Sequence, residues 1–328
     1  MKTQTDERII AEPEKSLHDE GTRKMARATV AAVIVLYRPD LALLDRLARS
    51  IARQVDKVFV IDNTPGAGGD KPASFDDCLQ PVSYHANGFN MGLAGGQNAG
   101  IRRAVYEGYT HVLLLDQDSA LPETALEGLL AAERTLLQAG CQVAAVGPLF
   151  IDEKNGQRCG AVRHSWLHMR WSPIPDHATE PVETDYLIGS GSLIRSSILT
   201  KVGLMREELF IDWVDAEWAY RARSMGYLSY IAPTVVMKHS VGDATGRFLG
   251  KSFNLHSPAR NYYIVRNAIY LTREPRMSWR WRLTMPIYVP KYILVHSWLS
   301  KRRIRSLWQM ARAVWEGVAG TMRPFTEQ

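Results

Sequence analysis

Two aspartates, Asp116 and Asp118, stand one residue apart directly after the apolar run VLLL. Carboxylates this close repel each other unless a cation, a proton or solvent separates them. Carboxylate oxygens are ligands that Mg²⁺ and Mn²⁺ prefer, so the pair is a candidate metal site. An ordinary turn before a helix capped at Ser119 would explain the same residues. His239 is most simply structural on its own, but with the two aspartates it becomes a candidate third metal ligand.

A second group of acids, Asp212, Asp215 and Glu217, lies in the segment FIDWVDAEW. One interpretation is structural: Asp215 caps a helix, and Glu217 occupies its first turn, where negative charge is favourable. The other is catalytic: one of the acids is a general base at the rim of a pocket. In that case Trp213 and Trp218 would provide apolar platforms for a sugar or a lipid.

A glycine- and asparagine-rich stretch, HANGFNMGLAGGQNAG, opens a predicted helix. Free N–H groups and the helix dipole make such a helix start a suitable anion site. The spacing departs from G-x-G-x-x-G, and the alternative is a helix start that only needs tight turns. The glycines that allow close backbone approach are Gly92, Gly95, Gly96 and Gly100, and the asparagines that supply polar contacts are Asn87, Asn90 and Asn98.

The segment GRFLGKS at 246–252 resembles a phosphate-binding P-loop but has one residue too few between its glycines. No apolar strand leads into it, and the phosphate-binding geometry depends on loop length. We therefore predict no P-loop here, although Arg247 and Lys251 could reach a diphosphate from a flexible loop.

Alternating strand and helix patterns from residue 29 to about residue 120 must position these side chains. An apolar strand ends at Tyr37, a helix with one apolar face follows over 41–55, and a second strand ends at Asp62. A third strand leads through the glycine-rich turn into a helix, and a fourth strand ends at Asp116. This order predicts a doubly wound, Rossmann-like α/β fold, in which ligands bind beyond the carboxyl ends of the strands.

The composition and the ends of the chain divide it into three regions. At 328 residues and 46% apolar content, the chain can form one large core or two modest ones. Three cysteines without CxxC spacing argue against disulfides or a zinc knuckle and suit a reducing cytosol. Residues 1–28 lack the apolar core of a signal peptide and predict a disordered or loosely ordered arm. We expect an α/β domain at 29–245, then a flexible loop and a helical region at 246–328.

The helical region is basic and rich in tryptophan. Residues 273–323 hold eleven Lys and Arg against two acids, and five of the nine tryptophans. Their most apolar stretch contains two prolines and a lysine, and falls short of the ~20 apolar residues that cross a bilayer. This composition is typical of a surface lying on anionic lipid. The alternative is a solvated basic helix pair packing through its tryptophans, and no motif supports binding of nucleic acid.

The chain resembles the GT-A fold glycosyltransferases of family 2, and within them the bacterial L-rhamnosyltransferases. The matching motifs follow in order from residue 30 to about residue 270, and LLLDQDS with FIDWVDAEW is particular to the rhamnosyl branch. The α/β domain would accordingly be a GT-A catalytic domain. The other motifs are LYRP, VFVIDNT, NGFNMGLAGGQNAGI, SGSLIR, KHSVGD and SPARNYYIVRN.

The resemblance implies a nucleotide-sugar donor, dTDP-β-L-rhamnose. Tyr37 and Asp62 would flank the base and the ribose, and Asn90 and Gly92 would line the nucleotide side. The full set of donor-binding candidates is Tyr37, Asp62, Asn90, Gly92, Asn98, Asp116, Arg247 and Lys251.

The resemblance also implies a cofactor, Mg²⁺ or Mn²⁺. Asp118 would bind the metal ion, with Asp116 nearer the ribose and His239 on the ion's other side.

The catalytic acid of the family's Glu-Asp motif aligns with Asp215. Here Val214 precedes it instead of an acid, and Glu217 follows two residues later, so Asp215 and Glu217 are both candidate bases. Asp212, Trp213 and Trp218 would lie on the acceptor side.

These roles predict an inverting transfer that yields an α-L-rhamnoside. The acceptor would be a lipid-linked saccharide or glycolipid of the O-antigen, rhamnan or rhamnolipid type. The enzyme would be cytoplasmic and peripheral at the inner face of the cytoplasmic membrane, with oligomers possible through the C-terminal helices. The alternatives are a nucleotidyltransferase that forms sugar nucleotides and a non-catalytic lipid-binding α/β protein.

Overall fold

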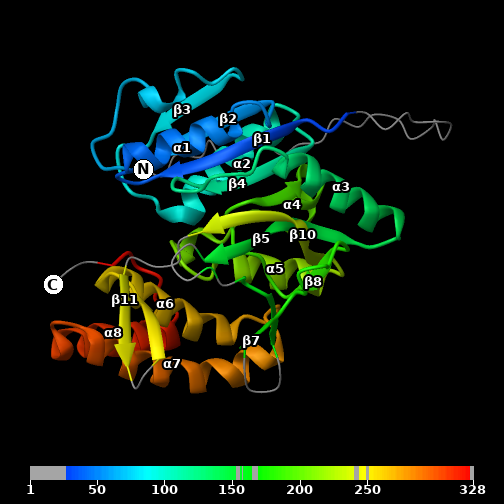
Figure 1. Cartoon of the computed structure of the whole chain (residues 1–328). Coiled ribbons are helices and arrows are strands. Elements are labelled where there is room, and N and C mark those ends of the chain that lie inside the picture. The colour runs from blue at the N-terminus through cyan, green and yellow to red at the C-terminus, as the bar shows by residue number, and fades with distance from the viewer. Residues whose placement is uncertain are drawn as a thin grey trace.

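The computed structural model describes residues 27–152, 156, 158–164, 169–239, 244–248 and 251–325. Its centre is an eight-stranded sheet in the order β3-β2-β1-β4-β9-β5-β10-β8 (Figure 1). Only β9 and β8 run antiparallel to their neighbours, so the predicted α/β fold is confirmed. The strands are β1 (Val30–Leu36), β2 (Lys57–Asp62), β3 (Val82–Ala86), β4 (His111–Asp116), β5 (Val143–Asp152), β8 (Val182–Thr184), β9 (Ser192–Arg195) and β10 (Leu228–His239).

The strands β1, β2 and β4 end at one edge of the sheet. Leu36 of β1 pairs with Asp62, and Val35 pairs with Asp116. The chain adds β2 and β3 on one side of β1 and then returns to β4 on the other side. The switch point therefore lies between β1 and β4, where open α/β sheets bind their ligands.

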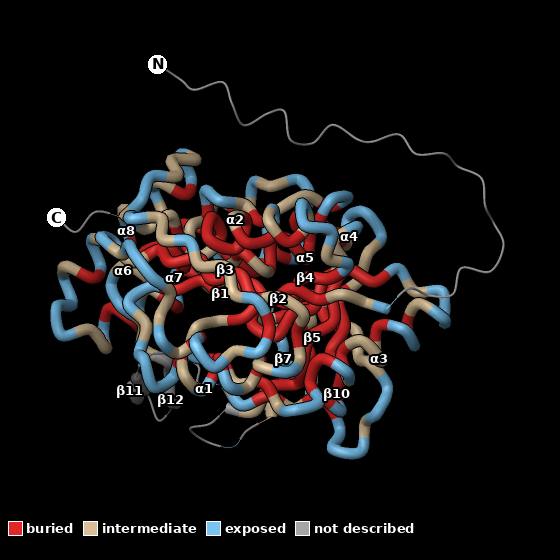
Figure 2. Tube along the Cα trace, turned by 90° about the horizontal axis from the view of Figure 1, so that it is seen from above, coloured by how far each residue is buried: buried red, intermediate tan, exposed pale blue. Residues whose placement is uncertain are grey.

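Helices cover both faces of the sheet. Successive residues of a strand point to opposite faces, and Ala32 and Ile34 belong to one apolar cluster with α1 and α3. Ala31 and Val33 belong to the other cluster, with α2, α4 and α5. Figure 2 shows that the buried residues concentrate along the strands. These helices are α1 (Leu41–Ile51), α2 (Gly92–Tyr106), α3 (Ala125–Gln138), α4 (Ser196–Val202) and α5 (Val214–Ser224).

Two glycines let α2 lie close against β1. A Cβ atom at Gly100 would stand 2.4 Å from Cγ1 of Val33, and one at Gly96 would stand 2.6 Å from Cγ1 of Val35. Real side chains do not tolerate such distances in a close-packed interior. Packing of the helix on the strand, and not an anion, explains these two glycines.

Three C-terminal helices, α6 (Pro258–Tyr270), α7 (Trp279–Leu299) and α8 (Arg303–Ala319), extend one apolar cluster of the sheet (Figure 1, orange and red). Trp281 and Met310 belong to the same cluster as Val33. None of the helices in the described part of the chain is long and apolar enough to cross a membrane.

The remaining elements are short. They are the hairpin of β6 (Ala161–His164) and β7 (Met169–Ser172), the ribbon of β11 (Ala244–Phe248) and β12 (Lys251–Leu255), and the 3₁₀ turns η1 (Ala73–Phe75), η2 (Glu207–Leu209) and η3 (Leu271–Arg273). The boundary expected at 245/246 falls inside β11. Residues 1–26 of the expected arm lie outside the described residues, and the division into three regions stays a prediction.

Candidate active site

The loops after β1 and β4 are tied together at the switch point. Gln117 Oε1 accepts a hydrogen bond from the Tyr37 backbone N–H (2.8 Å), and Gln117 Nε2 donates to the Tyr37 carbonyl oxygen (3.3 Å). The residue between the two predicted metal ligands therefore fixes the neighbouring loop. The Tyr37 ring itself is 42% exposed, with the Arg38 guanidinium 5.5 Å from its centroid. An exposed ring at this edge can stack against a flat ligand.

Asp62, at the end of β2, is buried and oriented by two donors. Its Oδ2 accepts from the Tyr84 hydroxyl group (2.9 Å), and its Oδ1 accepts from the Thr64 backbone N–H (2.8 Å). Burial, the hydrogen bond and the charge of Asp62 raise the pKa of Tyr84 to about 12. Asp62 and Tyr37 thus meet at the edge where the sequence predicted the nucleotide to bind.

Asp116 and Asp118 differ in their surroundings. The Asp116 backbone N–H donates to the Ser190 hydroxyl group (3.1 Å), and that hydroxyl group also bonds to Ser119. Asp118 is exposed, and its backbone carbonyl accepts a hydrogen bond from Arg46 (3.1 Å). Among the described residues, no three His, Cys, Asp or Glu side chains are grouped to hold a metal ion.

Asp215, in the first turn of α5, is held by the same loop that holds Asp116. Its Oδ2 accepts from the Gly189 backbone N–H (3.0 Å), and its Oδ1 accepts from the Ala216 N–H (2.9 Å). Gly189 and Ser190 are adjacent. One loop therefore contacts both Asp116, at the end of β4, and Asp215, at the start of α5. This arrangement brings together two of the predicted site residues that lie far apart in the sequence.

The pKa of Asp215 is raised to about 6. Burial is the main cause; the two backbone hydrogen bonds lower the pKa, while the charges of Asp116 and Asp212 raise it further. A carboxylate with a pKa just below neutral is suited to general-base catalysis, because it is ionised near pH 7 yet binds a proton readily.

The segment before α5 has unusual backbone angles. Phe210, Asp212 and Trp213 have positive φ values of 68°, 62° and 63°, and such sparsely populated conformations cost about 1–3 kcal/mol per non-glycine residue. The Phe210 carbonyl oxygen accepts from the Ala94 N–H (3.2 Å), and a Cβ at Gly92 would stand 2.7 Å from that oxygen. A glycine is therefore required at position 92 for contact with Phe210, and its place beside the nucleotide stays a prediction.

The structure does not favour Glu217 as the base. Its side chain is 2% exposed and bonded to Arg221 through both oxygens, at 2.9 and 3.0 Å. Arg221 also donates to the carbonyl oxygens of Val202 and Leu204. This buried ion pair fastens α5 to the end of α4 and favours Asp215 as the candidate base.

The three predicted acceptor-side residues differ in their exposure to solvent. Trp218 is 3% exposed, and its indole N–H donates to the Gly203 carbonyl (2.8 Å), so it is a core residue and no platform. Trp213 is partly exposed, with its indole N–H on the Ile264 carbonyl (3.0 Å). Asp212 forms an ion pair with Arg260 (3.1 Å).

The two asparagines of the donor set have structural partners. Asn98 is 1% exposed, donates to the Met205 carbonyl and to Glu207 (2.8 Å each), and accepts from the Met205 N–H (2.9 Å). It therefore anchors the loop that carries Met205 and Glu207, and its donor-binding role stays a prediction. Asn90 Oδ1 accepts from the Gly92 N–H (2.9 Å), so part of the predicted anion site at the start of α2 is bonded within the protein.

Three predicted ligands lie outside the described side chains. His239 ends β10, where its backbone pairs with Asp152, and Arg247 and Lys251 lie in β11 and β12. The metal role of His239 and the diphosphate role of Arg247 and Lys251 stay predictions.

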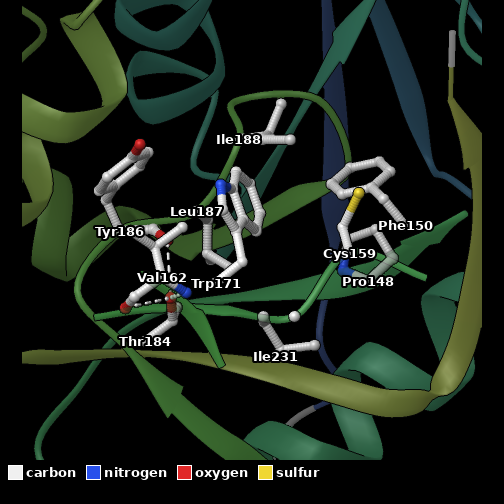
Figure 3. Close-up of a pocket in the computed structure, with 11 residues that line it drawn as sticks. Pro148, Phe150, Cys159, Val162, Trp171, Thr184, Tyr186, Leu187, Ile188 and Ile231 are labelled. Atoms are coloured by element: carbon white, nitrogen blue, oxygen red, sulfur yellow. Dashed lines mark hydrogen bonds between the residues drawn. The ribbon is translucent and has the colours of Figure 1, made fainter. Parts of the chain in front are cut away.

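A small apolar pocket lies beside the loop that carries Gly189. Tyr186, Ile188 and Trp171 are among its lining residues (Figure 3). Its volume of about 20 Å³ matches one water molecule, too small for a sugar ring. Burial, followed by the charge of Asp215, raises the pKa of the Tyr186 hydroxyl group. The pocket is thus lined by the residues directly before the loop that contacts Asp215.

Sequence reasoning assigned no role to Gln117, Gly189 or Ser190, which hold the site together. Gln117 stands between the two aspartates, and Ser190 opens the motif SGSLIR. Their positions beside recognised motifs were the available signal.

Comparisons with known proteins bear on the family and the fold. The sequence profile described as Glycosyl transferase family 2 matches residues 32–203. The dTDP-rhamnosyl transferase RfbF of Shigella flexneri is 30% identical over 298 residues, which cover 89% of this chain and 96% of that protein.

Two solved structures share the fold. The crystal structure of GalNAc-T7 with UDP, GalNAc and Mn²⁺ gives a TM-score of 0.52 at 16% identity, over 90% of this chain and 58% of that one. S. aureus TarS 1–349 in complex with UDP-GlcNAc gives 0.52 at 14% identity, over 89% and 83%. At these identities the likeness shows a common fold alone.

Proposed function

The chain belongs to glycosyl transferase family 2 and has the GT-A fold, and on this premise we propose that it transfers L-rhamnose from dTDP-β-L-rhamnose to a hydroxyl group of a lipid-linked saccharide or glycolipid. The acceptor is of the O-antigen, rhamnan or rhamnolipid type. The match to a family of glycosyl transferases argues against both alternatives, the nucleotidyltransferase and the non-catalytic lipid-binding protein.

The donor is supported by two observations. The relative named as a dTDP-rhamnosyl transferase aligns over most of both chains. At the sheet edge, Tyr37 offers an exposed ring and Asp62 a buried, oriented carboxylate, features that suit a base and a ribose.

The single observation that supports the reaction is that the Gly189–Ser190 loop contacts both the Asp116 backbone N–H and the Asp215 carboxylate, whose pKa the charge of Asp116 raises. Asp215 takes the proton of the acceptor hydroxyl group while that oxygen bonds to C1 of the rhamnose. The bond between C1 and the diphosphate oxygen breaks on the opposite face, and dTDP leaves with the electron pair. A single displacement of this kind inverts C1 and gives the α-L-rhamnoside.

The residues present fit a divalent ion. Mg²⁺ is usually bound through one or two carboxylates together with substrate phosphates, and Asp116 and Asp118 supply such hard oxygen ligands at the end of β4. His239 remains the proposed third ligand. A bound Mg²⁺ or Mn²⁺ would neutralise charge on the leaving diphosphate.

The acceptor and the location at the membrane are supported by the outer faces of α7 and α8. On α7 the exposed apolar residues follow helical spacing, at Trp279, Leu283, Ile287, Leu294 and Trp298. On α8 an exposed stripe of Ile304, Leu307, Trp308, Trp315 and Val318 lies opposite a buried stripe of Ser306, Met310, Ala313 and Gly317. Helices with exposed tryptophans among many arginines are suited to lie in the interface of an anionic membrane.

We therefore propose a peripheral position on the inner face of the cytoplasmic membrane, close to a lipid-linked acceptor. Self-association through the same helices is the competing use of these faces. Sedimentation equilibrium in the absence of lipid distinguishes the two, because self-association would appear there and membrane binding would not.

The donor is tested by thermal unfolding with a panel of nucleotide sugars, each with Mg²⁺ and with EDTA. A ligand at 100 times its Kd stabilises the folded state by about 2.7 kcal/mol. We expect dTDP-β-L-rhamnose with Mg²⁺ to raise the Tm clearly more than UDP-GlcNAc or dTDP-glucose. Equal stabilisation by UDP-GlcNAc would contradict the proposed donor.

A further inference from the structure

The end of α6 holds two polar residues, Arg266 and Asn267, that the proposed reaction leaves without a role. Both side chains are completely buried, with 0% exposure. Burying a guanidinium or an amide group is unfavourable unless hydrogen bonds replace those to water. Their hydrogen-bond partners therefore indicate what the two residues do.

Asn267 binds three carbonyl oxygens of one short segment. Its Nδ2 donates to Leu209 (2.8 Å), Ile211 (2.8 Å) and Asp212 (3.0 Å), residues that lie 55 to 58 positions earlier in the chain. The two amide hydrogens are thus shared among three carbonyl oxygens within residues 209–212.

Arg266 orients that amide and extends the clamp. Its Nε and Nη2 donate to Asn267 Oδ1 at 3.0 and 2.8 Å, so the Nδ2 group must face the segment. Its Nη2 also donates to the carbonyl oxygens of Glu208 (3.0 Å) and Leu209 (3.1 Å). The guanidinium carbon lies 4.8 Å from the Tyr263 ring centroid, which further fixes its plane.

The clamped segment is the stretch of backbone with positive φ values that leads into α5. Phe210, Asp212 and Trp213 all have positive φ, and such conformations persist only where the surroundings over-determine them. The carbonyls bound by Asn267 belong to this segment or adjoin it. Directly after it, the first turn of α5 carries Asp215.

The geometry points to Asn267, oriented by Arg266, as a positioning residue: it fixes the backbone at 208–212 so that α5 begins where the Asp215 carboxylate can meet the acceptor hydroxyl group. This inference rests on the proposed function in taking Asp215 as the base. The role differs from general stabilisation, because the clamp acts on the segment that leads directly into the first turn of α5, which carries Asp215.

The same helix offers a matched control, Asn261. It is also buried, at 8% exposure, but its Nδ2 donates to the His256 carbonyl (3.2 Å) and its Oδ1 accepts from the Tyr292 hydroxyl group (2.6 Å). Asn261→Ala therefore removes a buried asparagine from α6 without touching the 208–212 segment.

The test compares Asn267→Asp, Asn267→Ala and Asn261→Ala in the full chain. Asn267→Asp has nearly the same shape and keeps the acceptor for Arg266, but loses the N–H donors. We measure the Tm and, by calorimetry, the Kd of dTDP with Mg²⁺. The rate is the release of dTDP from dTDP-β-L-rhamnose with octyl α-L-rhamnoside as the acceptor. We expect kcat to fall about 10- to 100-fold in both Asn267 variants, as misplacement by about 1 Å can cause, while the Kd of dTDP stays within about twofold.

The outcomes separate the role from the proposed function. Asn261→Ala should keep kcat within about threefold at a comparable loss of Tm. A folded Asn267→Asp variant with wild-type kcat, or an equal loss in Asn261→Ala, would overturn the positioning role alone, as would failure of both Asn267 variants to fold. No dTDP release by the wild-type chain would overturn the proposed function and this role with it.

Discussion

The neighbours of Asp215 have opposing effects on its pKa. Two backbone N–H groups, from Gly189 and Ala216, favour the charged carboxylate, yet burial and the charges of Asp116 and Asp212 outweigh them. The resulting pKa of about 6 means that the group is ionised at neutral pH but only by a small margin. A base in this range can take a proton from a hydroxyl group more effectively than an ordinary aspartate can.

We therefore expect kcat/KM to fall about tenfold per pH unit below pH 6, because protonation of Asp215 removes the base. Asp215→Asn should lower kcat by about 10²–10⁴-fold with donor binding nearly intact. Calorimetry with dTDP and initial rates over pH 5–8 provide the measurement.

The stability of the same variant is the control. Folding raises the pKa of Asp215, so its charged form is disfavoured in the folded protein. The free energy of unfolding therefore falls as the pH rises from the ordinary pKa of an aspartate to the raised pKa of about 6. Asp215→Asn should therefore not lower the Tm at pH 7.5. Near wild-type turnover in a folded Asp215→Asn variant would remove Asp215 from the role of base.

The residues of α5 show which side-chain roles the sequence could disclose. Asp215 and Glu217 are two positions apart, so they face different sides of the helix. The spacing of Glu217 and Arg221 is that of an i,i+4 ion pair, a signal already present in the sequence that favours a structural Glu217. Asn98 gives no such signal, because its partners lie more than 100 residues away.

At the scale of elements, α2 and β1 illustrate how a helix is placed against a strand. Gly100→Ala would remove the conformational cost of glycine in a helix, a gain of up to about 1 kcal/mol. The added Cβ would, however, stand 2.4 Å from Cγ1 of Val33 in the buried strand. We expect the clash to dominate and to lower the free energy of unfolding by about 1–3 kcal/mol, measured by urea denaturation.

A second glycine of α2 provides the control. A Cβ at Gly95 would meet the flexible Met91 side chain, with its nearest atom at 3.1 Å, so Gly95→Ala should be close to neutral. Val33→Ala combined with Gly100→Ala should recover part of the loss. A Gly100→Ala variant as stable as the wild type would show that α2 is not held against β1 as described.

The elements themselves were predictable where the signal is local. The apolar runs that end at Tyr37, Asp62 and Asp116 predicted the parallel strands and their common edge, and the order of elements predicted the α/β fold, which is confirmed. The contacts of Asn267 with the 209–212 segment span 55 to 58 residues, and no local pattern encodes them. The sequence therefore discloses the candidate acids but not the long-range contacts, such as those of Asn267, that position their backbone.

At the scale of the whole molecule, the C-terminal helices face in two directions. Their inner sides share an apolar cluster with the sheet, through residues such as Trp281 and Met310. Their outer sides expose the tryptophan stripes of α7 and α8. The helix α6 also carries Asn267, which binds the backbone at 209–212. The same three helices therefore connect that segment with the surface proposed to contact the membrane. Deleting them would expose core, so point variants are the appropriate probes.

The membrane surface can be tested on two residues of α8. Trp308 and Trp315 are 73% and 72% exposed, so replacing both with serine should leave the Tm nearly unchanged. Since burying a large apolar side chain contributes about 1.5–3 kcal/mol, we expect binding to vesicles containing anionic lipid to weaken at least about tenfold in a sedimentation assay. Tyr106→Ser, which removes an 81% exposed aromatic residue from α2, is the matched control and should bind as the wild type does. Unchanged vesicle binding by the double variant, or equal weakening by the control, would refute the assignment of this face to the membrane and favour its use in self-association.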